Sequence, residues 1–443
     1  MNSNSSIFRL NNFLKRTEHY PITIYVGKWL LLTVLIGILA GSASSLFLLL
    51  LKWSTEYREE NLWIIGLLPL AGLLVGFVYH YFGKDVESGN NLLIDEIHKP
   101  SRIIPWKMAP LVLWGTVMSH LFGGSAGREG TAVQMGGALA DQLSRPFKLR
   151  PRDRKVIIIA GISAGFASLF GTPLAGAIFG LEVFFIGRMR YDAIFPSFSA
   201  AIIANYVTDL WGIGVLHTHY HIPEFPQVTA FTILYCILAG VVFGLVALLF
   251  ARFTHLCNLL YKRISSFSPL RLFIGGMVVA LGVFLIGTTK YIGLGIPTIL
   301  ESFDMKLPWY DFLVKIVFTS FTLGAGFKGG EVTPLFFIGA TCGNALSEIL
   351  PLPMGLLAGL GFVAVFSGAA NTPLATTIMA IELFGVEVGV FAGIACVVSY
   401  LFSGHAGIYS AQVIGTSKHA LYSREEGKRL SQVGVVKKVL RFF

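Results

Sequence analysis

Long apolar stretches alternate with short polar ones along most of the chain. Residues 29–51, 62–82, 228–250 and 272–288 are predominantly apolar. Each is close to the length of about 20 residues that a helix needs to cross a bilayer. The pattern therefore predicts an all-α polytopic membrane protein that crosses the cell membrane several times.

The overall composition agrees with a membrane protein. Of the 443 residues, 54% are hydrophobic and only 13% are charged, which leaves too few polar side chains to cover the surface of a soluble domain. The formal net charge of +10 comes mostly from the ends of the chain and from loops such as 145–155. Basic runs beside apolar spans favour contact with anionic lipid, and we expect no nucleic-acid partner.

The polar ends of the chain indicate its orientation. Residues 1–28 are amphipathic and lack the short apolar core and cleavage site of a secretory signal. Arg9, Lys15 and Arg16 precede the first span, which favours a cytoplasmic N-terminus. The basic tail at residues 416–443 favours a cytoplasmic C-terminus.

Cysteine and histidine give no sign of a metal or cofactor site. Cys236, Cys257, Cys342 and Cys396 are scattered and lie mostly in apolar segments, without the spacing of metal ligands. We interpret them as small core residues. The histidines, including His120, are not clustered, and we predict no cofactor.

The chain contains an internal repeat. When residues 161–184 are placed over residues 361–384, ten of the 24 positions are identical, including Glu182 and Glu382. Upstream, GREGT (127–131) matches GGEVT (329–333) at nearly the same offset. Two matches in the same order predict a first membrane repeat at 29–225 and a second at 226–415, between the 1–28 segment and the 416–443 tail.

The repeat places two carboxylates, Glu129 and Glu331, at matching positions. Each lies in a glycine-rich break that is followed by an apolar run, so each is expected near a helix N-terminus at membrane depth. Broken helices at matching places in two repeats are typical of transporter substrate sites. A helix N-terminus has free N–H donors and about half a positive charge, which suits an anion. Glycine allows a close approach of the backbone.

A carboxylate at such a site would act as a tethered anion. Ionised Glu129 would occupy the anion-binding position itself, whereas protonated Glu129, without its charge, would be held there less strongly. Arrival of a mobile anion and protonation of Glu129 would therefore favour each other, which predicts anion/proton exchange. The structural alternative is a carboxylate that pairs with Arg128 or caps its own helix, although carboxylates inside membranes are usually functional.

These motifs together resemble the CLC family of anion channels and anion/proton antiporters. They are GREG in a glycine-rich frame, GGE-x-TP, two TPLA-bearing helices and GIYS (407–410), and the likeness covers roughly residues 30–415. The resemblance implies two inverted-topology halves whose broken helices meet at the bilayer midplane. It also implies a homodimer with one pore per subunit, in which 161–184 and 361–384 are similar to the dimer contact.

The resemblance also implies roles for single residues. Glu129 matches the gating glutamate of the family, and Tyr409 matches a tyrosine whose hydroxyl faces the central anion. Without its motif, Tyr409 would be interpreted as an aromatic residue at the membrane interface.

Several positions depart from the usual family pattern. Asn90 stands where the first anion-binding segment has serine, and Thr131 stands where proline follows GxEG. Glu331 is an additional carboxylate, and Val332 replaces phenylalanine. Val183 aligns with the inner glutamate of many proton-coupled members, so Glu331 is predicted to supply the proton step instead.

These departures resemble the fluoride-exporting branch of the family. Fluoride is small and strongly hydrated, and the amide of Asn90 and the hydroxyl of Thr333 are compact donors that it could use. A plain helix N-cap is the alternative for Asn90. The residues predicted to gate and transfer protons are Glu129 and Glu331. Those predicted to bind the anion are Asn90, Gly127, Arg128, Gly130, Thr131, Val332, Thr333 and Tyr409.

Three functions remain open at the level of sequence. The first is a secondary active transporter that exports fluoride in exchange for protons. The second is a CLC-type chloride channel or chloride/proton exchanger. The third is an intramembrane enzyme that uses Glu129 and Glu331 as an acid/base pair, for which the chain shows no nucleophile motif and no cluster of metal ligands. We therefore predict that the protein is not an enzyme.

Overall fold

The protein is a bundle of helices in a computed structural model that describes residues 19–213 and 217–433. The helices of the first half are α2 (His19–Glu60), α3 (Leu68–Phe82), α4 (Asn90–His98), α5 (Met108–Leu121), α6 (Glu129–Gln142), α7 (Pro151–Phe170), α8 (Pro173–Glu182) and α9 (Ile194–Leu210). Those of the second half are α10 (Ala230–Ile264), α11 (Ser268–Ile286), α12 (Ile296–Asp304), α13 (Asp311–Ala325), α14 (Val332–Leu346), α15 (Met354–Ala370), α16 (Pro373–Phe384) and α17 (Gly389–Phe402).

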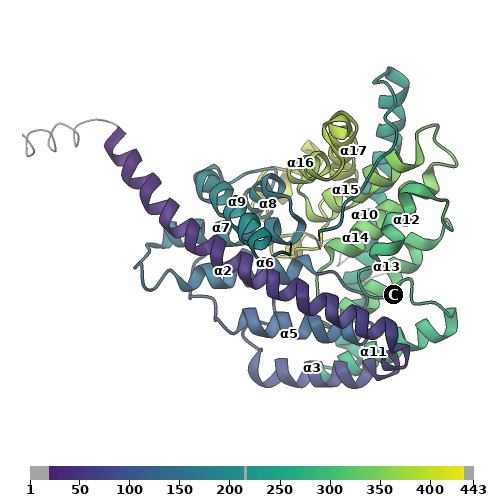
Figure 1. The fold of residues 1–443 in the computed structure, drawn as a ribbon, viewed down its shortest axis with the longest axis horizontal. Helices are drawn as coiled ribbons and strands as arrows, with labels where there is room; N and C mark the ends of the chain where they lie inside the picture. Colours follow the sequence, from purple (N-terminus) through teal and green to yellow (C-terminus); the bar gives the residue numbers. More distant parts are fainter. Residues whose placement is uncertain (1–18, 214–216, 434–443) are drawn as a thin grey trace, which may run out of the picture.

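The two halves repeat the same order of long and short helices. Each begins with a very long helix, α2 or α10, and each continues with a helix of medium length and a nine-residue helix, α4 or α12. Figure 1 shows that the first half, in purple and teal, lies beside the second half, in green and yellow. The all-α fold expected from the apolar pattern is therefore present in both halves.

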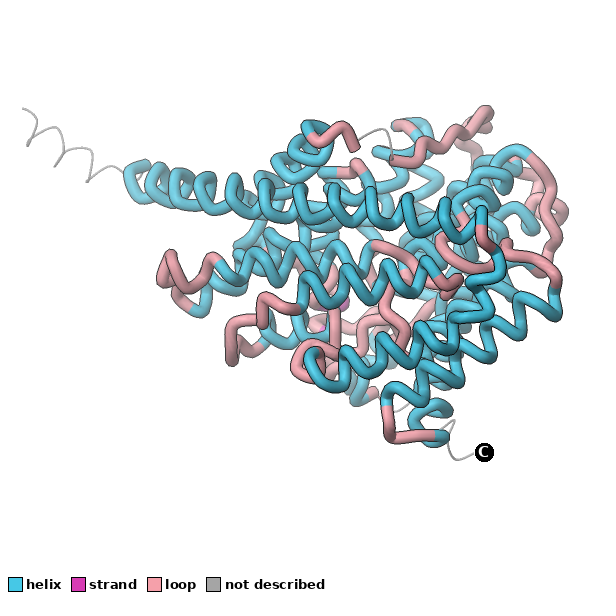
Figure 2. Tube along the Cα trace, turned by 60° about the horizontal axis from the view of Figure 1, so that its bottom comes forward, coloured by secondary structure: helices cyan, strands magenta, loops and turns pink. Residues whose placement is uncertain are grey.

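Several helices are suited to a membrane. Within the described residues, five helical stretches are long and apolar enough to cross a bilayer: 21–60, 62–82, 191–210, 230–264 and 268–286. They include the four apolar stretches predicted from the sequence, apart from the last two residues of 272–288 and the first two of 228–250. The remaining apolar helices are shorter, between 10 and 17 residues. Figure 2 shows non-helical segments inside the body of the bundle as well as at its ends.

The ends of the chain differ in how far they are described. Residues 1–18 of the expected N-terminal segment lie outside the described residues, and residues 19–28 already belong to α2. At the other end, residues 416–433 fold back onto the bundle beside a small parallel sheet. This sheet consists of β1 (Phe185–Ile186) and β2 (Val413–Ile414), with Phe185 opposite Val413.

Helices α8 and α16 pack on each other through a reciprocal contact. The carboxylate of Glu182, at the end of α8, accepts the N–H groups of residues 374 and 375 at the start of α16, at 3.2 and 2.9 Å. The carboxylate of Glu382 accepts the N–H groups of residues 174 and 175 in the same way, at 2.9 and 2.8 Å. Each carboxylate therefore satisfies donors that the first turn of the other helix leaves free.

The four cysteines lie in the interior, as predicted. All four thiols are free and buried. They pack within the helices of the second half among other apolar side chains, where a thiol acts as a small hydrophobic group.

Candidate functional site

The two glycine-rich segments lie against each other inside the bundle. The backbone N–H of Gly127 donates to the carbonyl oxygen of Gly330 at 2.6 Å, and Gly330 donates back to Gly127 at 2.7 Å. A Cβ atom on Gly330 would lie 2.7 Å from the backbone nitrogen of Gly130. Only glycine allows this approach, which brings together the first turns of α6 and α14.

Glu129 is the first residue of α6, and its carboxylate reaches the start of α14. One carboxylate oxygen accepts the backbone N–H of Thr333 at 3.0 Å and that of Arg128 at 3.1 Å. The other oxygen accepts the hydroxyl of Thr333. The side chain is fully buried. The sequence predicted a tethered anion at a helix N-terminus, and the helix that receives it belongs to the other half of the chain.

Arg128 contributes charge to the site but does not hold Glu129 closely. Its Nε atom lies 3.9 Å from the Glu129 carboxylate, near the outer limit of an ion pair, and has no hydrogen-bond acceptor. The guanidinium is largely buried. The alternative in which Glu129 is mainly the partner of Arg128 does not describe this geometry, because Thr333 supplies the shorter contacts.

Several backbone donors at the site have no acceptor. Among the described residues, the N–H groups of Gly130, Thr131 and Val332 make no hydrogen bond. The hydroxyl of Thr131 instead meets that of Thr116 on α5 at 2.6 Å. Thr131 therefore offers an anion its backbone N–H rather than its side chain. Free N–H groups at two helix starts give this part of the site a positive polarisation.

Glu331 directly precedes α14, as its match to Glu129 predicted. Its side chain is partly accessible. Its carboxylate accepts no hydrogen bond from any other described residue, in contrast to that of Glu129. Glu331 lies close enough to Glu129 and Tyr409 to interact with both electrostatically. The structure thus brings the two predicted carboxylates and the predicted tyrosine to one place.

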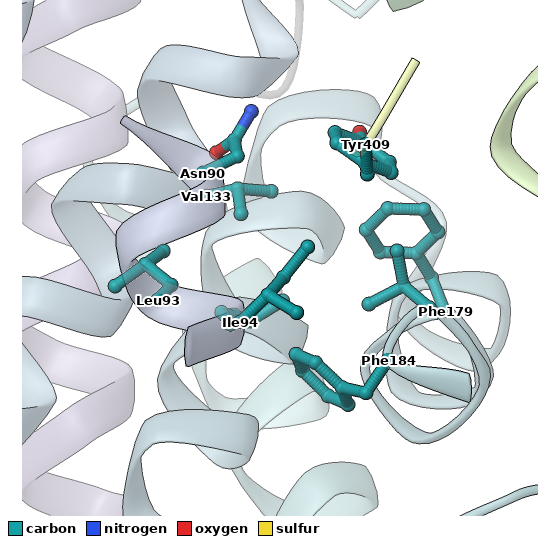
Figure 3. A pocket seen from close by; sticks show the side chains of 9 residues that line it. Asn90, Leu93, Ile94, Val133, Phe179, Phe184 and Tyr409 are labelled. Carbon is teal, nitrogen blue, oxygen red and sulfur yellow. The ribbon is translucent and has the colours of Figure 1, made fainter. Parts of the chain in front are cut away.

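Asn90 and Tyr409 line one narrow cavity, shown in Figure 3. The amide nitrogen of Asn90 and the hydroxyl of Tyr409 make no hydrogen bond with any described residue, so both are free donors. Asn90 is the first residue of α4, and its side chain makes no capping bond. Asn90 is therefore not an N-cap, because Gly89 precedes the helix in that position. Tyr409 is buried inside the bundle, unlike an exposed aromatic residue of a membrane interface.

The rest of this cavity is apolar. Its walls include Ile94, Phe179, Val183 and Phe184. The cavity admits the centre of a water-sized sphere over about 10 Å³, which is room for roughly one water molecule. Val183 places an aliphatic side chain at the position that the family resemblance aligns with the inner glutamate of many proton-coupled members. An ion in this cavity would find its polar contacts at Asn90 and Tyr409.

A buried charge network that the sequence reasoning missed holds the far ends of the site helices. Arg154 on α7 donates to Asp141 on α6 at 2.8 Å through two nitrogens, and to Glu96 on α4 at 3.0 Å. Asp141 and Arg154 are buried. Acidic residues next to apolar runs could have signalled this network, but their pairing depends on the packing of three helices.

Residues 71–404 match the sequence model of the family described as voltage-gated chloride channel. A "chloride/fluoride channel protein" of Pseudomonas syringae pv. tomato is 59% identical over 411 residues, which cover 91% of this chain and 90% of that relative.

Solved structures show the same architecture. A crystal structure of a CLC-type fluoride/proton antiporter is 34% identical, with a TM-score of 0.85, over 89% of this chain and 99% of that one. A slow cyanobacterial Cl⁻/H⁺ antiporter is 19% identical, with a TM-score of 0.74, over 93% of this chain and 98% of that one, and this likeness shows the fold alone. The chain is therefore a multi-pass membrane protein of the voltage-gated chloride channel (CLC) family.

Proposed function

We propose that this protein is a secondary active transporter that exports fluoride in exchange for protons. The observation that carries the proposal is the position of the Glu129 carboxylate on the donors of Thr333, beside a second carboxylate and two free donors. The names of a 59% identical relative and of a 34% identical structure both include fluoride, which supports the same ion here. Membership in an ion-transport family leaves the enzyme alternative without support.

The position of the Glu129 carboxylate at the start of α14 supports a gating and proton-carrying role. An ionised carboxylate satisfies the N–H and hydroxyl of Thr333, so a mobile anion must displace it to use the same donors. Protonation removes the charge that holds the carboxylate there. Proton uptake on Glu129 and anion binding to the donors of Thr333 therefore promote each other, which is the thermodynamic basis of exchange.

Glu331 is the proposed second proton carrier. It lies near Glu129 and Tyr409, and no other described residue donates a hydrogen bond to its carboxylate. A change in its protonation state therefore breaks no hydrogen bond to another described residue. The apolar side chain of Val183 supports the same assignment, because it provides no titratable group in the wall of the cavity.

The proposed anion path runs between the free donors of the two halves. Asn90, Tyr409 and the N–H groups of Gly130, Thr131 and Val332 would coordinate the ion, with Thr333 available once Glu129 leaves. Gly127 allows the close approach, and the guanidinium of Arg128 adds positive charge. Selectivity is a difference of affinities, and small, strong donors in a cavity of about the size of one water molecule favour fluoride over the larger chloride.

Chloride transport is the second candidate. The relative from Pseudomonas syringae is called a chloride/fluoride channel protein, which names both halides and a passive mode. Passive conduction needs no second proton carrier. The additional carboxylate at Glu331 therefore favours exchange for this chain.

We further propose a homodimer with both chain ends in the cytoplasm. Leu174 and Leu374, at the starts of α8 and α16, are large apolar side chains that remain substantially exposed. An apolar face at this place supports the dimer contact that the family resemblance implies. The basic residues near both ends of the chain support the orientation. The repeated order of long and short helices supports two membrane repeats at residues 29–225 and 226–415.

Ion flux through reconstituted protein tests the proposed function. The purified chain is placed in liposomes, and fluoride and chloride movement are measured with ion-selective electrodes, with and without a pH gradient. An antiporter drives fluoride uphill on the pH gradient, whereas a channel only dissipates a fluoride gradient. Protein-free liposomes under the same gradient correct for permeation of neutral hydrogen fluoride. Equal rates for the two halides would favour the chloride candidate.

A further inference from the structure

Asn91 connects the two sides of the anion cavity. It follows Asn90 in the first turn of α4, and its side-chain oxygen accepts the backbone N–H of Ala411 at 3.0 Å. Ala411 stands two residues after Tyr409. The bond therefore joins the helix that carries one free donor to the loop that carries the other, across 320 positions of sequence.

The tyrosine loop is held on its other sides by different elements. The amide of Gln412 donates to the carbonyl oxygens of Val183 and Ala370 at 2.8 Å each. His255 on α10 contacts the carbonyl oxygen of Gly407 at 3.2 Å. Within the described residues, the contact through Asn91 is the only hydrogen bond between α4 and the segment 404–415. Asn91 therefore provides the direct hydrogen-bonded link between α4 and this loop.

A second link joins α4 to the end of the chain at the surface. Arg429 forms an ion pair with Asp95 at 2.9 Å, and both side chains are about 40% exposed. Asp95 lies four residues after Asn91, on the same face of α4. Exposed ion pairs contribute little free energy, so this pair is a suitable internal comparison for Asn91.

We infer that Asn91 is a positioning residue for anion selectivity, which rests on the proposed halide transport by this site. Its bond to Ala411 sets how far Asn90 can stand from Tyr409. Close donors can replace the tight hydration shell of fluoride, whereas a wider gap accommodates chloride. Asn91 does not itself contact the ion; it acts by holding the two donors at the spacing that suits the smaller halide.

Two substitutions of nearly equal shape separate this role from simple packing. Asn91→Leu keeps the branched side chain and removes the acceptor. Asn91→Asp keeps the acceptor and adds negative charge near the site. Asn258→Leu is the matched control, because Asn258 also makes one hydrogen bond to backbone, to the carbonyl oxygen of Gly324 at 3.1 Å. Asp95→Asn removes the exposed ion pair on the same helix.

The full-length variants are reconstituted in liposomes, and initial fluxes of sodium fluoride and sodium chloride are compared. For Asn91→Leu, we expect the fluoride-to-chloride flux ratio to fall by about tenfold, the equivalent of ~1.4 kcal/mol, a size typical of one hydrogen bond. For Asn91→Asp, we expect the ratio to be retained while the fluoride KM rises, because the added charge repels both halides. Asn258→Leu and Asp95→Asn should keep the wild-type ratio.

The outcomes distinguish this inference from the proposed function. If the wild-type protein moves no halide, the proposed function fails. If the wild-type protein prefers fluoride and Asn91→Leu keeps the same ratio, the positioning role of Asn91 is wrong. The role is also wrong if Asn258→Leu lowers the ratio as much as Asn91→Leu, since the effect would then reflect general loosening. Should Asn91→Leu fail to fold, a reduced ratio in Asn91→Asp would count against the inference.

Discussion

Glu129 and Thr333 are 204 positions apart in the chain, and the carboxylate of Glu129 accepts both the backbone N–H and the hydroxyl of Thr333. One residue opens α6 and the other lies in the first turn of α14. A side chain of the first repeat thus occupies the anion-binding end of a helix in the second repeat. The same donors would serve a transported ion.

Glu129→Gln should abolish proton-coupled fluoride flux. Glutamine has nearly the size of glutamate and its amide oxygen can accept hydrogen bonds, but it does not titrate. We expect a loss of uphill fluoride movement on a pH gradient, measured in liposomes. Glu348→Gln is the control, because Glu348 is exposed and pairs only loosely with Lys306 at 3.6 Å. Uphill transport by the Glu129→Gln variant would show that another group carries the proton.

Glu331→Gln should stop coupled turnover while the protein keeps its fold. The carboxylate of Glu331 accepts no hydrogen bond from another described residue, so its loss should cost little stability. Thermal unfolding in detergent is therefore expected to match the wild type, and proton movement coupled to fluoride should disappear. Wild-type exchange rates in this variant would show that Glu331 does not carry the proton.

Asn90→Ser should narrow the difference between fluoride and chloride flux. Serine places its hydroxyl closer to the backbone than the asparagine amide, which widens the gap to Tyr409 across the cavity. We expect a lower fluoride-to-chloride ratio in parallel flux assays. Asn61→Ser is the control and should keep the ratio, because the Asn61 side chain makes a solvent-exposed hydrogen bond to the carbonyl oxygen of Tyr57, outside the site. An unchanged ratio in the Asn90→Ser variant would show that Asn90 does not determine halide selectivity.

Gly330→Ala should reduce transport by separating the starts of α6 and α14. The new Cβ would lie 2.7 Å from the nitrogen of Gly130. Overpacking of this kind destabilises the folded protein by roughly 1–3 kcal/mol. We expect lower flux of both halides with the helix content unchanged by circular dichroism. Gly66→Ala is the matched control, because a Cβ there would meet nothing within 4 Å. Full activity of the Gly330→Ala variant would contradict the requirement for this close approach.

Glu182→Gln should lower stability without changing halide selectivity. Its two carboxylate oxygens accept two N–H groups of α16, and an amide would turn an NH₂ group toward one of them. Loss of a hydrogen bond to a buried charged group costs about 1.5–3 kcal/mol, so thermal unfolding should begin at a lower temperature. Glu382→Gln should have a similar effect, since its contact mirrors that of Glu182. A changed fluoride-to-chloride ratio would instead connect Glu182 to the ion path.

The apolar pattern was sufficient to predict four of the five membrane-length helical stretches, because a bilayer requires continuous apolar stretches of a certain length. The stretch 191–210 was not predicted. The match between 161–184 and 361–384 likewise predicted two similar halves. Glycines around Glu129 and Glu331 correctly predicted helix starts, since glycine interrupts a helix and allows close approach. The apolar stretches and the glycine breaks are local properties that neighbouring residues determine, and the repeat can be recognised by comparing two segments of the sequence.

Contacts between distant segments depended on the tertiary structure. The sequence placed Glu129 at a helix start, but only packing decided that its carboxylate, besides accepting the N–H of Arg128 at its own helix start, also reaches α14. The same holds for the bond between Asn91 and Ala411, the reciprocal contacts of Glu182 and Glu382, and the pairing of Thr131 with Thr116. Side-chain partners of this kind follow from how helices cross in space, and no periodicity along one helix records which helix will lie opposite.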